Sequence, residues 1–190
     1  MSVDWTYVKD DFVIIDFETT GLRPHTDRVI EIGAIRFNKK KFLETSAVDS
    51  FSALIKQDKP LPKKITEITG ITDKDLASGG DAKQSIESLL DFIGDRTVLA
   101  YNAEFDMAFL EVECKRCGAN LKNTLHVVCV LELVRDALPN MRNHKLSTLA
   151  QSLGLTVTHR ALSDCSVTLQ VLVQCMQVSD RKRLYRKYFN

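Results

Sequence analysis

Near the start of the sequence, residues 12–21 form an apolar stretch that ends with two carboxylates and a turn signal. Asp16 and Glu18 are separated by one residue and are followed by a Thr-Thr-Gly turn signal. The stretch predicts a buried strand, and because strand side chains alternate between faces, Asp16 and Glu18 should point to the same side. Two carboxylates this close raise each other's pKa unless a cation neutralises them, and hard cations such as Mg²⁺ or Mn²⁺ prefer carboxylate oxygens. The spacing therefore predicts half of a metal site, although a solvated turn is the simpler alternative for this pattern alone.

Two further aspartates fall at the starts of predicted helices. Asp106 lies in the first turn of a helix that follows a short buried strand at 97–100, and Asp164 opens the last long helix. His159 lies in the loop before Asp164. Each residue alone has a simpler explanation, since helix starts favour carboxylates and an exposed loop tolerates a histidine.

Together, these residues predict a two-metal site for phosphodiester cleavage. Acidic positions at strand ends and helix starts could converge on one edge of the sheet with His159. Two cations about 3.5–4 Å apart would clamp the attacking and leaving oxygens, while a base takes a proton from water. Histidine suits that role because its pKa lies near neutral pH, and a position on a loop would let it approach once substrate is bound.

The elements that must position these residues follow from the apolar periodicity. Strands are predicted within 12–21, at 29–37, ending at 51–55, at 97–100 and at 124–128. Helices are predicted at 63–69, from the capping-box sequence at 81–84 to Gly94, from 104 to Gly118, and around 130–138, 146–153 and 162–177. Residues 38–41 should form a turn, so that the first three strands make an antiparallel meander. Strands first and then alternating helices and strands favour an α/β fold, with helices on both faces of a mixed sheet.

Length and composition are those of one soluble domain. The chain has 190 residues, of which 44% are hydrophobic and 27% are charged. A net charge of +1 argues against a histone-like binder but not against a nuclease with an acidic site. The five cysteines are irregularly spaced, no secretory signal opens the chain, and no apolar run could span a bilayer. These features predict reduced thiols in a cytoplasmic protein with no membrane association.

Three stretches resemble the exonuclease motifs of the DEDD superfamily. They are Asp16-Phe17-Glu18-Thr19-Thr20-Gly21, Asn102-Ala103-Glu104-Phe105-Asp106 and His159-Arg160-Ala161-Leu162-Ser163-Asp164. The position of His159 resembles the histidine-bearing, DnaQ-like branch, and the stretches at 68–72 and 144–150 are also similar to family positions. The resemblance runs from about Phe12 to Met176. One such motif is a weak signal, whereas three in order with this spacing are a strong one.

The resemblance implies an RNase H-like fold with a five-stranded mixed sheet flanked by helices. It also implies 3′→5′ exonuclease activity that releases nucleoside monophosphates. By analogy, Asp16, Glu18 and Asp164 would ligate the first of two divalent cations, Mg²⁺ or Mn²⁺, and Asp16 with Asp106 would hold the second. His159 would activate the water.

Substrate contacts are expected close to the first two motifs. Backbone N–H groups of the strand-end loop could reach the terminal nucleotide. Aromatic or apolar side chains there could stack on bases or wedge beside them, although Phe17 and Phe105 are better explained as core residues. The residues assigned to substrate binding are Phe17, Thr19, Thr20, Gly21, Leu22, Asn102 and Phe105.

The motifs are most similar to those of proofreading exonucleases of bacterial replicative polymerases, both separate subunits and domains embedded in a polymerase. The expected partners are therefore single-stranded DNA 3′ ends and a DNA polymerase or other replication protein. The alternatives are an RNA-trimming exonuclease of the same fold, a nuclease-fold binding module without catalysis, and a subunit that mainly docks onto a polymerase or helicase. The expected organisation is a lead-in at 1–11, an exonuclease domain at 12–177 and a basic C-terminal tail at 178–190.

Other residues have open roles. Glu31 lies in apolar surroundings and could assist the metal site, but a hydrogen-bonded structural carboxylate is the simpler interpretation. Tyr101 stands where the family often has a histidine, and Cys129 where it often has an aspartate, which could affect substrate contacts. Cys114 and Cys117 have the spacing of half a zinc site or of a redox pair, but no second pair in the sequence completes a zinc site, and the two lie late in a predicted helix rather than after a strand.

Overall fold

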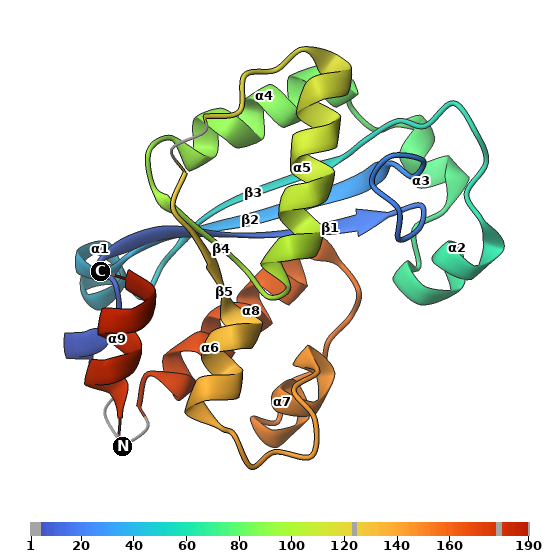
Figure 1. Cartoon of the computed structure of the whole chain (residues 1–190). Coiled ribbons are helices and arrows are strands. Elements are labelled where there is room, and N and C mark those ends of the chain that lie inside the picture. Colours follow the sequence, from blue (N-terminus) through green and yellow to red (C-terminus); the bar gives the residue numbers. More distant parts are fainter. Residues whose placement is uncertain (1–4, 123–124, 178–179, 190) are drawn as a thin grey trace.

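A five-stranded mixed sheet, in the order β3-β2-β1-β4-β5, forms the centre of the computed structural model (Figure 1). The structure describes residues 5–122, 125–177 and 180–189. The strands are β1 (Asp11–Thr19), β2 (Val29–Asn38), β3 (Asp49–Leu54), β4 (Thr97–Ala100) and β5 (Val127–Cys129). β1, β2 and β3 pair antiparallel, whereas β4 and β5 continue the sheet in parallel with β1. The predicted α/β class and the mixed sheet that opens with an antiparallel meander are confirmed.

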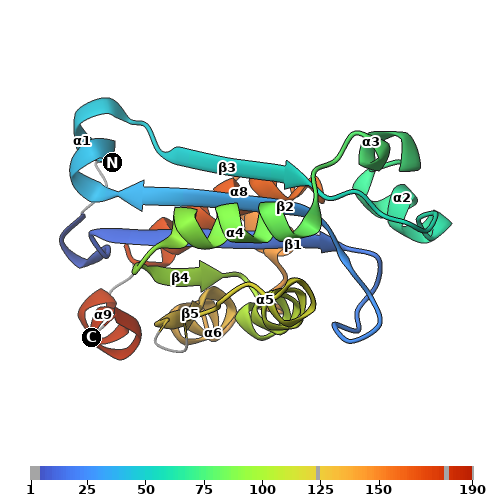
Figure 2. The same ribbon diagram turned by 90° about the horizontal axis from the view of Figure 1, so that it is seen from above.

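Helices cover both faces of this sheet (Figure 2). The helices of the described chain are α1 (Lys39–Thr45), α2 (Lys63–Thr69), α3 (Asp73–Ala77), α4 (Ala82–Ile93), α5 (Ala103–Cys117), α6 (Val130–Ala137), α7 (Leu146–Ser152), α8 (Ala161–Cys175) and α9 (Arg181–Phe189), with a short 3₁₀ helix at Trp5–Tyr7. Of the two large cores, one lies between the sheet and α4 and α5, and the other lies between the sheet and α6 to α9, while a third, small cluster joins Ile30 to Ile71 and Leu76. Among the helices that the structure describes, none combines the length and the apolar character needed to cross a bilayer.

The central strand β1 contributes to both cores, which explains why its sequence is apolar without alternation. Val13 and Ile15 point into the core under α4 and α5. Phe12 and Ile14 point into the core under α8. Because this part of the strand is covered on both faces, all four side chains from Phe12 to Ile15 are buried and apolar.

The connection from β2 to β3 differs from the prediction. The sequence predicts a turn at 38–41, but this stretch begins helix α1, so the prediction was wrong. The Asn38 side chain accepts a hydrogen bond from the Lys41 backbone N–H at 3.0 Å and caps the helix. Phe42 anchors it, with its ring 5.3 Å from that of Phe37. The three consecutive lysines favour the prediction of a turn, whereas the Asn38 cap and the packing of Phe42 are the signals of a short helix.

Other predicted boundaries lie close to the observed ones. β5 begins at Val127, inside the stretch predicted as 124–128, of which residue 124 lies outside the described residues. The predicted helices at 130–138, 146–153 and 162–177 correspond to α6, α7 and α8. Helix α3 is absent from the prediction, and its signal is a capping box between Thr72 and Asp75.

Helix α9 belongs to the core rather than standing apart from it. It lies in the segment expected to be a basic tail, and its Leu184 and Phe189 side chains are buried beside those of α6 and α8. The ring of Tyr185 lies 6.3 Å from that of Tyr7. The two ends of the described chain therefore pack together, at the end of the sheet away from the C-terminal end of β1 (Figure 1).

Candidate active site

Four carboxylates from three separate elements interact at the C-terminal end of β1. Asp16 and Glu18 share the face of β1 on which Ile14 meets α8. Asp106 lies in the first turn of α5, and Asp164 lies in the first turn of α8. Asp106 and Asp164 are nearly buried, with exposed fractions of 4% and 5%. The structure thus brings together the acidic residues that the sequence separates.

The tightest grouping consists of Glu18, His159 and Asp164. One carboxylate oxygen from each acid and one imidazole nitrogen lie within 4.8 Å of one another. His159 is exposed, and its φ of 52° lies in the left-handed region. The backbone N–H of Thr158 donates to the Asp164 carboxylate at 3.2 Å, which ties the loop to the start of α8. A solvent-facing histidine therefore stands beside two carboxylates.

Burial raises the pKa of all four carboxyl groups. For Asp16, burial is the largest cause, and the negative charges of Asp106, Glu18 and Asp164 add to it. The pKa of Glu18 and that of Asp106 each rise to about 7, in both cases mainly because of burial. Carboxylates that repel one another in a buried setting are stabilised as anions by a hard cation. The four residues therefore fit divalent cations.

Glu31 stands next to this group but is occupied elsewhere. It lies opposite Glu18 in the β1–β2 register. Its carboxylate accepts hydrogen bonds from the Arg160 side chain, the shortest at 2.7 Å, and from the Ala161 N–H at 2.9 Å. Of the two interpretations that the sequence leaves open, the structure supports the structural carboxylate. Arg160 is not among the predicted site residues, and its position beside His159 is the sequence signal that would have indicated it.

The loop that joins β1 to β2 is held in place from α5. Glu113 is buried and binds the Arg28 guanidinium, with the shorter contact at 2.8 Å. Arg116 contacts Glu113 at 3.0 Å and donates to the backbone oxygens of His25 and Asp27 at 2.7 and 2.9 Å. The loop next to the carboxylates is therefore fixed by the Arg28–Glu113 ion pair and by the two hydrogen bonds from Arg116 to its backbone.

The predicted substrate residues of this loop divide into buried and exposed positions. The Thr19 hydroxyl donates to the Gly21 backbone oxygen at 2.5 Å, and the Thr20 hydroxyl accepts from the Arg28 N–H at 3.0 Å. Both hydroxyls therefore shape the turn. Leu22 projects from it with 81% of its side chain exposed, which leaves an apolar group available beside the site.

The two phenylalanines assigned to substrate binding have different surroundings. Phe17 is 5% exposed and lies in the core, so that its ring offers no face to a base. Phe105 is partly buried and packs on Phe109 with ring centroids 4.9 Å apart. Asn102 is exposed at the start of α5, where its side chain makes no capping hydrogen bond. Of the three, Asn102 has the side chain that is freest to contact a substrate.

The two residues that depart from the family pattern make contacts within the protein. The Tyr101 hydroxyl donates to the backbone oxygen of His144 at 2.5 Å. The Cys129 thiol donates to the backbone oxygen of Tyr101 at 3.7 Å. These contacts join the end of β4 to β5 and to the segment before α7, and neither residue belongs to the carboxylate group.

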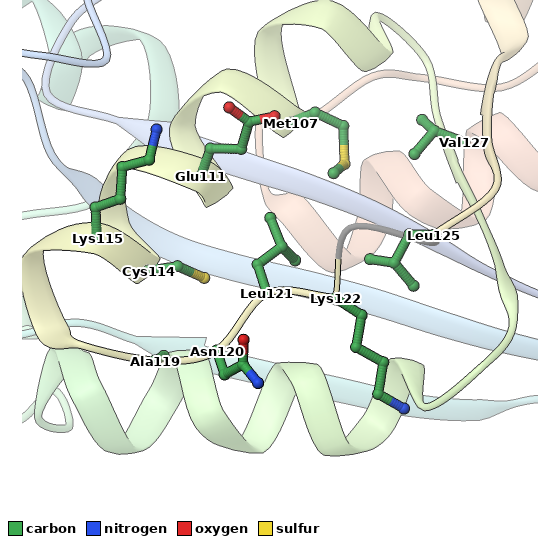
Figure 3. A pocket seen from close by; sticks show the side chains of 10 residues that line it. All are labelled: Met107, Glu111, Cys114, Lys115, Ala119, Asn120, Leu121, Lys122, Leu125 and Val127. Atoms are coloured by element: carbon green, nitrogen blue, oxygen red, sulfur yellow. The ribbon is translucent and has the colours of Figure 1, made fainter.

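A separate cavity of about 460 Å³ lies between α5 and the chain that follows it (Figure 3). Met107, Cys114 and Leu121 give it an apolar lining, and Glu111 and Lys115 add charge. None of the four carboxylates lines it, and neither does His159. The cavity is therefore not part of the candidate site.

The fold and the site define a class of nuclease. The family model described as Exonuclease (RNase_T) matches residues 13–172, and the chain belongs to this family. The chain is 34% identical over 171 residues to the PolC-type DNA polymerase III of Bacillus cereus, a match that covers 89% of this chain and 12% of that polymerase. The corresponding polymerase of Thermotoga maritima is 34% identical over 180 residues, covering 94% of this chain and 13% of the polymerase. The chain thus spans about one eighth of the length of these curated relatives.

Solved structures share the fold at low sequence identity. The nuclease domain of 3′hExo, a DEDDh family member bound to rAMP, has a TM-score of 0.76 and 19% identity, with 92% of this chain and 95% of that chain covered. E. coli exonuclease I in complex with a dT13 oligonucleotide has a TM-score of 0.77 and 19% identity, with 94% of this chain and 43% of that chain covered. The fold is therefore that of DEDDh exonucleases, as the resemblance of the three motifs implies.

Proposed function

We propose that the chain is a metal-dependent 3′→5′ exonuclease that hydrolyses DNA from its 3′ ends. The observation that carries this proposal is the meeting of carboxylates from β1, α5 and α8 with His159, which lies within 4.8 Å of Glu18 and Asp164. The residues that would hold two cations, Mg²⁺ or Mn²⁺, are Asp16, Glu18, Asp106 and Asp164. When bound, such cations neutralise the charge of the phosphodiester and lower the pKa of a water molecule.

The chain itself supplies a base and a grip on the substrate. His159 faces solvent at the edge of the carboxylates, where a ring nitrogen can accept the proton of the attacking water. The turn after β1 presents the apolar Leu22 side chain, which fits beside the terminal base of a single strand. Asn102, exposed at the start of α5, offers an amide for the sugar or phosphate.

The similarity to polymerases favours DNA and proofreading. PolC-type DNA polymerase III enzymes match nearly the whole of this chain, and E. coli exonuclease I is a structural neighbour in complex with dT13. We propose single-stranded DNA 3′ ends as the substrate and a replicative DNA polymerase as the partner. A proofreading role would place the protein with replicating DNA in the cytoplasm of a bacterial cell.

RNA is the second candidate substrate. The structural neighbour 3′hExo is bound to rAMP, and another neighbour is a 3′-exonuclease that recognises the histone mRNA stem-loop. The 2′-hydroxyl is the group that would separate the two substrates.

The test compares 5′-labelled single-stranded DNA and RNA of one sequence, each with Mg²⁺ or Mn²⁺. A ladder that shortens from the 3′ end on DNA, and that disappears with EDTA or in the Asp106→Asn variant, supports the proposal. Asp91→Asn, at an exposed carboxylate of α4, is the matched control and should retain the wild-type rate. A ladder on RNA alone would replace DNA by RNA as the substrate, and no ladder on either would overturn the nuclease assignment.

A further inference from the structure

Glu31 holds the chain where it enters α8. The Arg160 Nε donates to both oxygens of the Glu31 carboxylate at 3.1 and 3.2 Å, and its Nη2 donates to one of them at 2.7 Å. The Ala161 N–H donates to the other oxygen at 2.9 Å. Glu31 is only 2% exposed, so both oxygens are used within the protein and neither can reach a substrate.

The body of α8 is held separately, by direct contact with β2. An added Cβ at Gly33 would lie 2.3 Å from the backbone carbon of Ala161 and from the backbone nitrogen of Leu162. The Cys165 thiol donates to the Gly33 backbone oxygen at 3.4 Å. The position of the helix therefore depends on Gly33, whereas Glu31 fixes the residues just before it.

His159 is the residue that needs this support. It directly precedes Arg160, and its φ of 52° is one that residues other than glycine rarely adopt. Such a conformation persists only when the surrounding contacts hold it. The chain between residues 158 and 161 is held by the hydrogen bonds of Arg160 and Ala161 to Glu31 and by two hydrogen bonds of Asp164, one from the Thr158 N–H to its carboxylate and one from its own N–H to the Arg160 backbone oxygen at 3.0 Å.

We propose that Glu31 is a positioning residue for the nuclease reaction, acting through His159. The proposal rests on the proposed nuclease function. Glu31 lies opposite Glu18 on the neighbouring strand, and the two side chains share one face of the sheet. By fixing Arg160 and Ala161, Glu31 keeps the imidazole of His159 beside the carboxylates. A base displaced by about 1 Å can cost about 10²-fold in rate, so a residue that never touches the substrate can control the reaction.

The test variant is Glu31→Gln, which keeps the shape of the side chain but removes its charge. We expect kcat to fall by about 10–100-fold, the range typical of residues that orient a site residue, with little change in KM. Glu113→Gln is the matched control. Glu113 is also 2% exposed, and it also binds arginines and one backbone N–H, that of Val29.

A double-mutant cycle separates positioning from general stability. In the His159→Ala background, Glu31→Gln should cause no further loss of rate, because the group on which it acts is gone. Glu113→Gln should lower activity by the same factor in both backgrounds. Equal losses from Glu31→Gln with and without His159 would overturn the proposal.

A second readout uses the metal-free protein and requires no activity. The chain has four histidines, and the ring signals of His159 in an NMR spectrum are those that the His159→Ala variant lacks. Glu31→Gln should shift or broaden the His159 signals and leave those of His126 and His144 unchanged. Glu113→Gln should instead affect His25, whose backbone is held by Arg116. An unmoved His159 in Glu31→Gln would overturn the proposal even if activity fell.

The two proposals fail in different ways. Wild-type protein that folds but cuts neither DNA nor RNA would overturn the nuclease function, and the NMR comparison would still decide whether Glu31 positions His159. Nuclease activity in the wild type, combined with unchanged His159 signals in Glu31→Gln, would overturn only the proposal that Glu31 positions His159.

Discussion

Burial raises the pKa of Asp16, and the negative charges of four neighbouring carboxylates raise it further. Burial also raises the pKa values of Glu18 and Asp106, to about 7 from ordinary values of 4.5 and 3.8. The unfolded chain has no such cluster, so it ionises at lower pH than the folded protein. Raising the pH from about 4 to about 7 therefore favours the unfolded state when no cation is bound.

The Asp106→Asn variant tests this electrostatic cost. We expect the free energy of unfolding of the metal-free wild type to fall between about pH 4 and pH 7, and to fall less in the variant. At pH 8 in EDTA the variant should be more stable than the wild type. For a domain of this size, each kcal/mol gained in the free energy of unfolding raises the Tm by about 2–4 °C. Added Mg²⁺ should raise the Tm of the wild type more than that of the variant. Thermal unfolding across pH measures this, and parallel curves for the two proteins would contradict the prediction.

His159→Ala tests the base. We expect the cleavage rate to fall by about 10²–10⁴-fold, because a positioned base typically contributes that much. His25→Ala is the control, since His25 is exposed and its known contact is made by its backbone. A wild-type rate in His159→Ala would remove this residue from the reaction.

At this scale the sequence predicts which carboxylates come together, but it does not predict the contacts that support them. Asp16, Glu18 and Asp164 could be named from residue types at strand ends and helix starts. The ion pair between Glu31 and Arg160 could not be predicted from the sequence, because it joins positions 129 residues apart and depends on how closely α8 approaches β2. No local pattern encodes such a contact.

At the scale of whole elements, α8 is positioned by its direct contact with β2 at Gly33. Gly33→Ala would place a methyl group 2.3 Å from the backbone of α8, and backbone cannot move aside as a flexible side chain can. We expect a loss of about 1–3 kcal/mol in the free energy of unfolding and a lower cleavage rate, because α8 carries Asp164. Gly80→Ala, whose added carbon would meet only the Ser85 hydroxyl at 3.2 Å and the Leu54 backbone oxygen at 3.9 Å, is the control. Urea unfolding and the exonuclease assay measure both effects, and equal outcomes for the two variants would contradict the prediction.

The β1–β2 loop allows a different prediction. Arg116→Ala removes the hydrogen bonds to the backbone of His25 and Asp27, so the loop that carries Leu22 should lose its fixed position. We expect KM for single-stranded DNA to rise by about 5–30-fold, which corresponds to one or two kcal/mol, with a smaller effect on kcat. Lys115→Ala, at the exposed neighbouring position on α5, should leave KM unchanged. A loss confined to kcat would show that the loop does not bind substrate.

Elements were predictable where apolar periodicity is strong and were missed where a cap is the only signal. α4 and α8 follow their apolar spacing, and β1 follows its continuous apolar run. α1 and α3 are short, carry few buried residues and depend on Asn38 and on the Thr72–Asp75 capping box. Such helices are stabilised by their surroundings, so sequence patterns alone do not reveal them.

The two ends of the sheet have different roles in the whole molecule. The C-terminal end of β1, which carries Asp16 and Glu18, lies at one end of the sheet, and α9 lies at the other (Figure 1). Leu184→Ala should lower the free energy of unfolding by about 2–5 kcal/mol, because this side chain is fully buried in the core shared by α6 and α8. Below its unfolding temperature the variant should cut DNA at the wild-type rate. Leu43→Ala, at a leucine that is 57% exposed, is the control, and a slower rate in folded Leu184→Ala would contradict this separation of ends.

The distance along the chain between β2 and α8 also matters during protein synthesis. A ribosome delivers Asp16, Glu18 and Glu31 early, but His159 and Asp164 come close to the end of the domain. Because domains fold as units once their sequence has emerged, a nascent chain that stops before α8 lacks His159, the proposed base, and Asp164, one of the proposed metal ligands. We therefore expect fragments released by interrupted translation to leave the nucleic acids around the ribosome intact.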